Sequence, residues 1–268
     1  MSRDGFDGVD LHIKDGIGFI TLNRPDSGNA FTLSVARSFL AAALQCEADK
    51  AVRCIVVTGE GRLFCAGGDV HLLSGAGERR AEVLSELVTV FHAAIQRLAH
   101  GSKPLVTLVN GPAAGAGFSL AMLGDIVIAA RSAHFTAAYS AIGLTPDGGL
   151  SWLLPRLVGF RRAQDILLTN RRIKSEEAET IGLVSRIVED DDLGTEGRKA
   201  AEALRDGPLL ALGAARTLLY ESFTATFETQ LDRELRFMAA AGASAESREG
   251  LSALLSKKQV DFKRGPAG

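Results

Sequence analysis

Short apolar or alternating runs separate longer stretches of helical periodicity over the first 190 residues of the chain. Val9–Lys14 and Ile17–Leu22 are such runs, and the Asp15-Gly16 pair between them predicts a hairpin. Thr32 is the predicted N-cap of a helix that ends near Lys50. Further strands are expected at 54–58, 104–109, 126–130, 134–137 and 184–188, and further helices at 78–99, 150–157, 160–168 and 175–181.

The pattern changes after about residue 190, where no further strand is expected. Helical segments follow one another at 193–206, 208–221, 223–241 and 244–255. The sequence therefore predicts a strand-rich α/β region followed by an all-helical tail.

The stretch 110–125, NGPAAGAGFSLAMLGD, is the most distinctive feature of the α/β region. It follows an apolar run and is typical of a strand, a tight turn and a helix. Backbone N–H groups at a helix start have no acceptor inside the helix, and small residues let a ligand approach them. The stretch therefore suits an anion or oxyanion site, but on its own it suits a closely packed strand–helix corner better.

Two more glycine-rich loops, 61–69 and 142–149, follow predicted strands. Ligands of open α/β proteins gather at such strand ends. Neither loop has the GxxxxGK[ST] pattern of a phosphate-binding loop, and the glycines of 111–117 lack the dinucleotide-binding spacing. A nucleotide-binding fold is therefore disfavoured.

Composition excludes several classes of function. Apolar residues make up 46% of the 268 residues, and the net charge of -2 leaves no basic footprint for nucleic acid or an anionic membrane. Cys46, Cys54 and Cys65 lack metal-ligand spacing, so no metal site is expected. The N-terminus lacks the basic and then apolar pattern of a signal peptide, and no apolar run approaches the ~20 residues of a membrane span. We therefore expect a cytoplasmic protein.

Taken together, the loops resemble the enoyl-CoA hydratase/isomerase (crotonase) superfamily along nearly the whole chain. The segments that carry the resemblance are LNRP (22–25) with NAF (29–31), FCAGGD (64–69), NGPAAGAG (110–117), IGLTPD (142–147), LPRLVG (154–159), and EA (177–178) with GLV (182–184). The resemblance implies the α/β crotonase (ClpP-like) fold, a spiral of repeated ββα units. It implies that residues 1–190 bind acyl-CoA and that the helices of 191–268 form a homotrimer or a dimer of trimers. Coenzyme A is then part of the thioester substrate, and no separate cofactor is expected.

By the same resemblance, the backbone N–H groups of Gly68 and Ala116 form an oxyanion hole for the thioester oxygen. Losing one such donor typically costs about 10²–10³ in rate. An ordinary turn is the alternative for residues 66–68. The residues that the resemblance assigns to coenzyme A or substrate binding are Arg24, Ala66, Gly67, Asp69, Val70, Tyr139, and Phe262 and Lys263 from a neighbouring subunit. Arg24 could equally well be an ordinary surface arginine, and Phe262 and Lys263 could equally well belong to a frayed C-terminus.

Hydratases of the superfamily use two glutamates, because adding water needs a base and an acid. Ser119 and Tyr139 occupy those two positions here, so typical hydratase activity is not expected. Asp147 lies where isomerases and dehalogenases of the superfamily place their carboxylate. Apolar neighbours should raise its pKa by disfavouring the charged form. The alternative role for Asp147 is to cap the helix that begins near Gly149.

Within the superfamily, the run GLTPDGGLSWLLPR (143–156) looks most like the isomerases of phenylacetate degradation. That subgroup converts ring-1,2-epoxyphenylacetyl-CoA to oxepin-CoA, and its relatives shift 3-enoyl-CoA double bonds to position 2. The hypothesis is that Asp147 removes a C2 proton and returns a proton at C4.

Three alternatives remain. The first is an aroyl-CoA dehalogenase, in which Asp147 would be the nucleophile and His92 the base that activates water. Phe91 and Tyr139 stand where that enzyme has two tryptophans, and the position of His92 on the apolar face of its helix also fits a packed histidine. The second is an enoyl-CoA hydratase-like protein that lacks both hydratase glutamates. The third is a non-catalytic member of the superfamily that binds CoA esters or RNA.

Overall fold

The computed structural model describes residues 6–262, and its N-terminal part is an antiparallel hairpin. β1 (Val9–Lys14) pairs with β2 (Ile17–Leu22), and Asp15 and Gly16 turn the chain with positive φ angles of 50° and 78°. Asp and Gly adopt such angles most readily, which is why this pair specifies a two-residue turn. The predicted hairpin is confirmed.

The hairpin forms one edge of a six-stranded sheet in the order β1-β2-β3-β4-β6-β9. The other strands are β3 (Cys54–Gly59), β4 (Leu105–Val109), β6 (Ile126–Ala130) and β9 (Arg186–Val188), and they run parallel to β2. Every residue of β4 is buried. Parallel strands need crossover connections, which place helices over the faces of the sheet. Because these helices bury the strands, the strands are apolar along most of their length.

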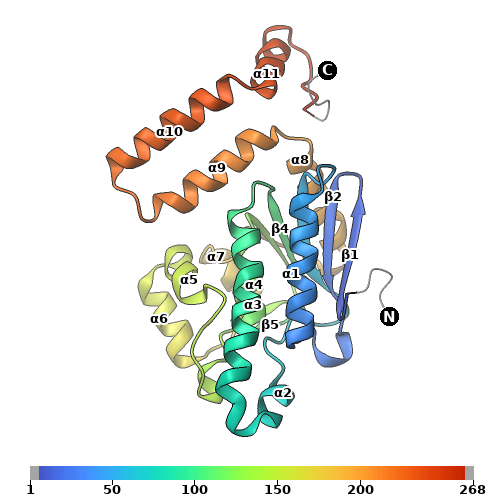
Figure 1. Ribbon diagram of the computed structural model, residues 1–268, viewed down its shortest axis with the longest axis vertical. Coiled ribbons are helices and arrows are strands. Elements are labelled where there is room, and N and C mark those ends of the chain that lie inside the picture. The colour runs from blue at the N-terminus through green and yellow to red at the C-terminus, as the bar shows by residue number, and fades with distance from the viewer. Residues whose placement is uncertain (1–5, 263–268) are drawn as a thin grey trace.

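α1 (Leu33–Ala48) and α3 (Arg80–His100) are crossover helices that pack against each other on the sheet (Figure 1). Thr32 caps α1 as predicted, because its hydroxyl oxygen accepts a hydrogen bond of 3.2 Å from the N–H of Val35. A short helix that was not predicted, α2 (Val70–Gly75), precedes α3. Its N-cap is Asp69, whose carboxylate accepts from two backbone N–H groups.

A second sheet of three strands lies beside the first and carries the glycine turn. Its strands are β5 (Ala113–Ala114), β7 (His134–Thr136) and β8 (Ile173–Lys174), and β5 leads directly into α4 (Ala116–Ala121). The remaining helices of this half are α5 (Leu150–Val158), α6 (Phe160–Thr169) and α7 (Ser175–Thr180).

The C-terminal helices are α8 (Leu193–Arg205), α9 (Leu209–Ser222), α10 (Phe227–Gly242) and α11 (Ala245–Leu255). α8 packs on the large sheet, whereas α9, α10 and α11 lie beyond one end of it (Figure 1). α10 begins at Phe227 and not at 223, because Thr226 caps it by accepting from the N–H of Thr229. α10 buries none of its residues, and Leu235 and Met238 are 67% and 74% exposed.

Across residues 6–262, no helix is both long enough and apolar enough to cross a membrane.

Candidate active site

The two predicted oxyanion turns come together at the join between the sheets. Cys65 forms a parallel bridge with Ala113, and this bridge sets the 65–68 turn beside the start of α4. Gly117 permits the approach, since a Cβ atom there would lie 2.3 Å from the carbonyl oxygen of Cys65. No side chain fits in that space, so the glycine in the motif is a packing requirement.

The N–H of Gly68 points away from Phe31, the residue with which Gly68 forms a bridge. The hydrogen bonds of this bridge come from the neighbouring residues: the N–H of Phe31 donates to the carbonyl oxygen of Gly67 at 2.8 Å, and the N–H of Asp69 donates to the carbonyl oxygen of Phe31 at 2.9 Å. Backbone groups alternate in direction along an extended segment. The N–H of Gly68 therefore points to the opposite side, where Gly68 lines a pocket.

Ala116 is the first residue of α4, so its N–H has no acceptor within the helix. The preceding residue, Gly115, turns the chain with a φ of 53°. Ala116 lines the same pocket as Gly68. The structure thus brings together the two backbone groups that the sequence motifs single out.

The pocket has a volume of about 250 Å³ and lies between the two turns, α2, α3 and the 138–147 loop. Most of its lining is apolar, as is usual for a small-molecule site. Among the described lining residues, the only carboxyl group belongs to Asp147 and the only hydroxyl to Tyr139. The other lining residues are Phe31, Ala66, Gly68, Val70, Leu73, Leu84, Leu87, Val88, Phe91, Gly115, Ala116, Ala138, Ala141, Ile142 and Leu144.

Within the described part of the chain, Asp147 faces this apolar pocket without a lysine or arginine partner. Desolvation by burial raises the pKa of its carboxyl group, and the hydrogen bond from Tyr139 opposes that rise. Neither Lys nor Arg is among the described groups that shift the pKa of Asp147. Its side chain does not cap α5, whose N-cap is Gly149 and which has no side-chain cap. The carboxylate is therefore free of the competing role that the sequence left open.

A network of hydroxyl groups adjoins Asp147, and the sequence did not indicate it. The hydroxyl of Tyr139 donates to Oδ1 of Asp147 at 2.6 Å and lies 3.1 Å from the hydroxyl of Ser119. The Ser119 hydroxyl also lies 2.9 Å from the backbone oxygen of Asp147. The signal that could have found this network is the replacement of both hydratase glutamates by hydroxyl residues.

His92 projects from α3 toward the same loop. Its Nε2 accepts a hydrogen bond of 2.9 Å from the N–H of Gly148. An accepting Nε2 carries no proton, so the neutral ring holds its proton on Nδ1. His92 is thus bound to the backbone next to Asp147, and is more than a packed residue of the helix.

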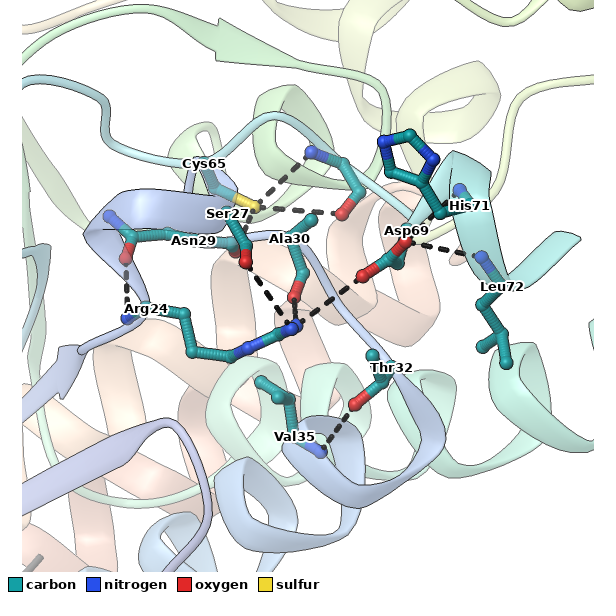
Figure 2. Close-up of polar contacts among 11 residues, drawn as sticks. Arg24, Ser27, Asn29, Ala30, Thr32, Val35, Cys65, Asp69, His71 and Leu72 are labelled. Carbon is teal, nitrogen blue, oxygen red and sulfur yellow. Dashed lines mark hydrogen bonds and ion pairs between the residues drawn. The ribbon is translucent and has the colours of Figure 1, made fainter. Parts of the chain in front are cut away.

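Of the residues predicted to contact coenzyme A or substrate, Ala66, Val70 and Tyr139 line the pocket. Arg24 and Asp69 are not among its lining residues and contact each other (Figure 2). The guanidinium of Arg24 lies 3.6 Å from the Asp69 carboxylate and donates to the carbonyl oxygen of Ala30 at 2.9 Å. Gly67 has a φ of 101°, and a Cβ atom there would lie 2.9 Å from the carbonyl oxygen of Ala114.

Phe262 and Lys263 were predicted to reach coenzyme A from a neighbouring subunit. The ring of Phe262 lies against α11 of its own chain, 3.5 Å from where a Cβ atom of Gly250 would be. Lys263 lies outside the described residues.

Comparison with known proteins connects this geometry to a family. The family model for enoyl-CoA hydratase/isomerase matches residues 12–265. The 1,2-epoxyphenylacetyl-CoA isomerase of Escherichia coli (strain K12) is 39% identical over 252 residues, which are 94% of this chain and 96% of that protein. The 4-chlorobenzoyl coenzyme A dehalogenase-2 of an Arthrobacter species is 30% identical over 259 residues, 96% of this chain and 94% of that protein. The crystal structure of an enoyl-CoA hydratase from Polaromonas sp. JS666 superimposes with a TM-score of 0.91 at 31% identity, covering 94% of this chain and 98% of that one.

Proposed function

The chain belongs to the enoyl-CoA hydratase/isomerase family and has the crotonase fold, and on that premise we propose that it is an acyl-CoA isomerase with one carboxylate as its acid and base. The observation that carries the proposal is Asp147. It has the only carboxyl group among the described residues of the pocket, and it shares that pocket with Gly68 and Ala116. The two reactions proposed are the shift of a 3-enoyl thioester to the 2-enoyl form and the isomerisation of ring-1,2-epoxyphenylacetyl-CoA to oxepin-CoA.

The double-bond shift follows from this arrangement. The thioester oxygen accepts hydrogen bonds from the N–H groups of Gly68 and Ala116, which stabilise negative charge as it develops there. The ionised carboxylate of Asp147 takes a proton from C2, and the electrons of that C–H bond pass into a dienolate. The protonated carboxyl group then gives a proton to C4, and the double bond ends between C2 and C3. One carboxyl group is sufficient because it ends in the state in which it began.

Burial suits Asp147 to this exchange. A carboxyl group with a raised pKa is a stronger base when ionised, and general bases work best when their pKa approaches the working pH. The raised pKa of Asp147 is therefore consistent with proton transfer near neutral pH.

Hydration is less well supported by the same pocket. Ser119 is buried and its hydroxyl faces oxygen atoms of Gly115, Asp147 and Tyr139. Neither this hydroxyl nor that of Tyr139 is a base at neutral pH, and the described lining of the pocket has no second carboxylate to activate water.

Asp147→Asn tests the proposal directly. Wild-type protein and the variant are incubated with 3-enoyl, 2-enoyl, epoxyphenylacetyl and halobenzoyl thioesters of coenzyme A, and products are followed by mass and ultraviolet spectra. We expect isomerisation by the wild type and a loss of about 10²–10⁴ in rate in the variant, with thioester binding retained. Full isomerase activity in Asp147→Asn would refute the assignment.

A halobenzoyl-CoA dehalogenase is the second candidate, because one relative at 30% identity carries that name and His92 lies beside the Asp147 loop. In that reaction Asp147 would attack the aromatic ring, and His92 would activate water. Against it, Nε2 of His92 is already bonded to Gly148. Halide release from the halobenzoyl thioester distinguishes the two candidates.

We also propose that the C-terminal helices mediate assembly into a homotrimer or a dimer of trimers. The support is the apolar surface of α10, which one chain leaves exposed. Exposed apolar surface of this kind is typical of protein–protein contacts. Sedimentation of the purified protein measures its oligomeric state.

A further inference from the structure

We propose that Tyr139 is a positioning residue, which reserves Oδ1 of Asp147 and thereby makes Oδ2 the oxygen that exchanges protons with the substrate. The inference rests on the proposed isomerase function and deepens it. It starts from the 2.6 Å hydrogen bond that the Tyr139 hydroxyl donates to Oδ1.

The direction of this hydrogen bond follows from the protons available. A tyrosine hydroxyl has one proton, and an ionised carboxylate can only accept. Burial and the neighbouring Asp147 raise the pKa of Tyr139, so its hydroxyl stays protonated at neutral pH. Tyr139 is therefore the donor as long as Asp147 is ionised.

The bond also persists when Asp147 takes up a proton. If the proton binds Oδ2, then Oδ1 becomes a carbonyl oxygen and still accepts from Tyr139. If the proton bound Oδ1, that oxygen would become the weaker acceptor of the two, and the hydrogen bond with Tyr139 would weaken or reverse its direction. The tyrosine thus favours one of the two oxygens in both steps of the proton transfer.

Two side chains hold the backbone of the Asp147 loop close to Tyr139. The hydroxyl of Ser119 lies within 3.1 Å of both the Tyr139 hydroxyl and the backbone oxygen of Asp147. The N–H of Gly148, the next residue along the chain, donates to Nε2 of His92. Because Ser119 is buried and His92 is half-buried, these contacts fix the backbone from which the Asp147 carboxylate extends toward the tyrosine.

A simple packing role for Tyr139 does not explain its hydroxyl group. Tyr139 is 8% exposed, and its ring forms part of the pocket wall, which a phenylalanine would do equally well. A buried hydroxyl costs free energy unless it is hydrogen-bonded. Here the hydroxyl donates to Asp147, the one carboxylate among the described residues that line the pocket.

The titratable groups that face Asp147 are Tyr139, His92 and the buried thiol of Cys65. Of these, only Tyr139 donates a hydrogen bond to the carboxylate among the described contacts. A donor to the charged form lowers a carboxyl pKa, so removing it raises the pKa. Activity that depends on ionised Asp147 would then appear at higher pH.

Tyr139→Phe tests this inference, because it removes one oxygen and keeps the ring. We expect kcat to fall about tenfold with KM changed less than about twofold, and the acidic limb of the kcat profile to move up by about one pH unit. Ser119→Ala should act in the same direction but less strongly. Tyr220→Phe is the matched control, since it removes the other tyrosine hydroxyl of the chain, outside this pocket.

A second readout does not depend on turnover. Protein labelled with ¹³C at aspartate carboxyl groups is titrated by NMR, and the Asp147 resonance is assigned by its absence in Asp147→Asn. Its midpoint should rise in Tyr139→Phe and stay unchanged in Tyr220→Phe. If the wild type isomerises no thioester, the proposed function fails, and the NMR midpoint alone decides whether Tyr139 controls Asp147.

An unmoved midpoint in folded Tyr139→Phe would overturn the inference. So would a moved midpoint with unchanged kcat and unchanged acidic limb in an active enzyme. A change confined to KM would assign Tyr139 to substrate contact instead.

Discussion

Asp125 and Asp147 are two acids in contrasting surroundings; the side chain of Asp125 is 24% exposed, and Asp147 is half-buried. Asp125 precedes β6, and its Oδ2 lies 2.7 Å from the guanidinium of Arg216 on α9. The same oxygen accepts a hydrogen bond of 2.7 Å from the N–H of Leu105. Arg216, only 7% exposed at its side chain, also donates to carbonyl oxygens at the end of α3, including that of Leu98 at 2.8 Å. This acid is part of the join between the sheet and the C-terminal helices.

Asp147 has a neutral hydroxyl donor where Asp125 has a cation. Its carboxylate accepts from Tyr139, and its backbone oxygen accepts from the N–H of Leu150 and lies 2.9 Å from the Ser119 hydroxyl. An ion pair holds a carboxylate charged and in place, which suits structure, whereas a desolvated carboxylate with a neutral donor can gain and lose a proton. The comparison teaches that the partner of an acid, more than its burial, decides whether an ion pair fixes its charge.

The largest expected difference is in stability. Asp125→Asn leaves the buried Arg216 without its charge partner and should lower the free energy of unfolding by about 3 kcal/mol. This value is at the lower end of the range for breaking a buried ion pair, because the side chain of Asp125 is 24% exposed. Asp147→Asn, the matched substitution, should not lower it at pH 7, since Asn can still accept from Tyr139. Denaturant unfolding of both variants measures this. Equal losses would show that the two acids have the same structural role.

The next effect concerns how tightly the two glycines that follow Asp147 are packed. A Cβ atom at Gly148 would lie 2.7 Å from Cβ of Ser119 and 2.8 Å from the ring of Phe91, whereas one at Gly149 would meet nothing within 4 Å. Both glycines have positive φ, 58° and 83°, so both alanine variants carry backbone strain and only Gly148→Ala adds a steric clash. Gly148→Ala should therefore be less stable than Gly149→Ala by about 2 kcal/mol, the cost of overpacking. Thermal or denaturant unfolding compares them, and a reversed order would contradict the packing argument.

The smallest effect is a pH dependence of stability. The pKa of Asp147 is raised in the folded protein, so ionisation of its carboxyl group lowers the free energy of unfolding. This loss of stability begins as the pH rises through the pKa of the unfolded chain, and it is complete above the pKa of the folded protein. Asp147→Asn should match the wild type at low pH and become the more stable protein at higher pH. The gain is about 1.4 kcal/mol for each unit by which the pKa is raised. Unfolding curves from pH 4 to pH 8 test the sign, and a gap that narrows as pH rises would contradict it.

Much of the fold follows from local pattern. The Asp15-Gly16 hairpin, the Thr32 cap and the apolar strand Leu105–Val109 each depend on residues adjacent in sequence, and each is confirmed. Strands of two residues, such as Ala113–Ala114, have no periodicity to detect and were not predicted as separate strands. α2 was missed because its six residues follow a glycine loop and are stabilised by the Asp69 cap.

The site was predictable to the extent that its groups belong to motifs. Gly68, Ala116 and Asp147 were singled out from the sequence, and the structure places them on one pocket. The hydrogen bonds of Tyr139 to Asp147 and of Gly148 to His92 were not predicted. The second joins residues 56 positions apart, and such contacts depend on how loops and helices pack.

By itself, the sequence determined which groups are present: glycines where Cys65 approaches closely, a carboxyl group at 147, and hydroxyl residues at 119 and 139 in place of acids. Only the tertiary structure decided which acid has a cation beside it and which oxygen of Asp147 is occupied. The physical reason is that backbone preferences are local, whereas desolvation and hydrogen bonding of a charge depend on every segment that folds around it. The same residue type therefore joins two parts of the molecule at position 125 and faces the pocket at position 147.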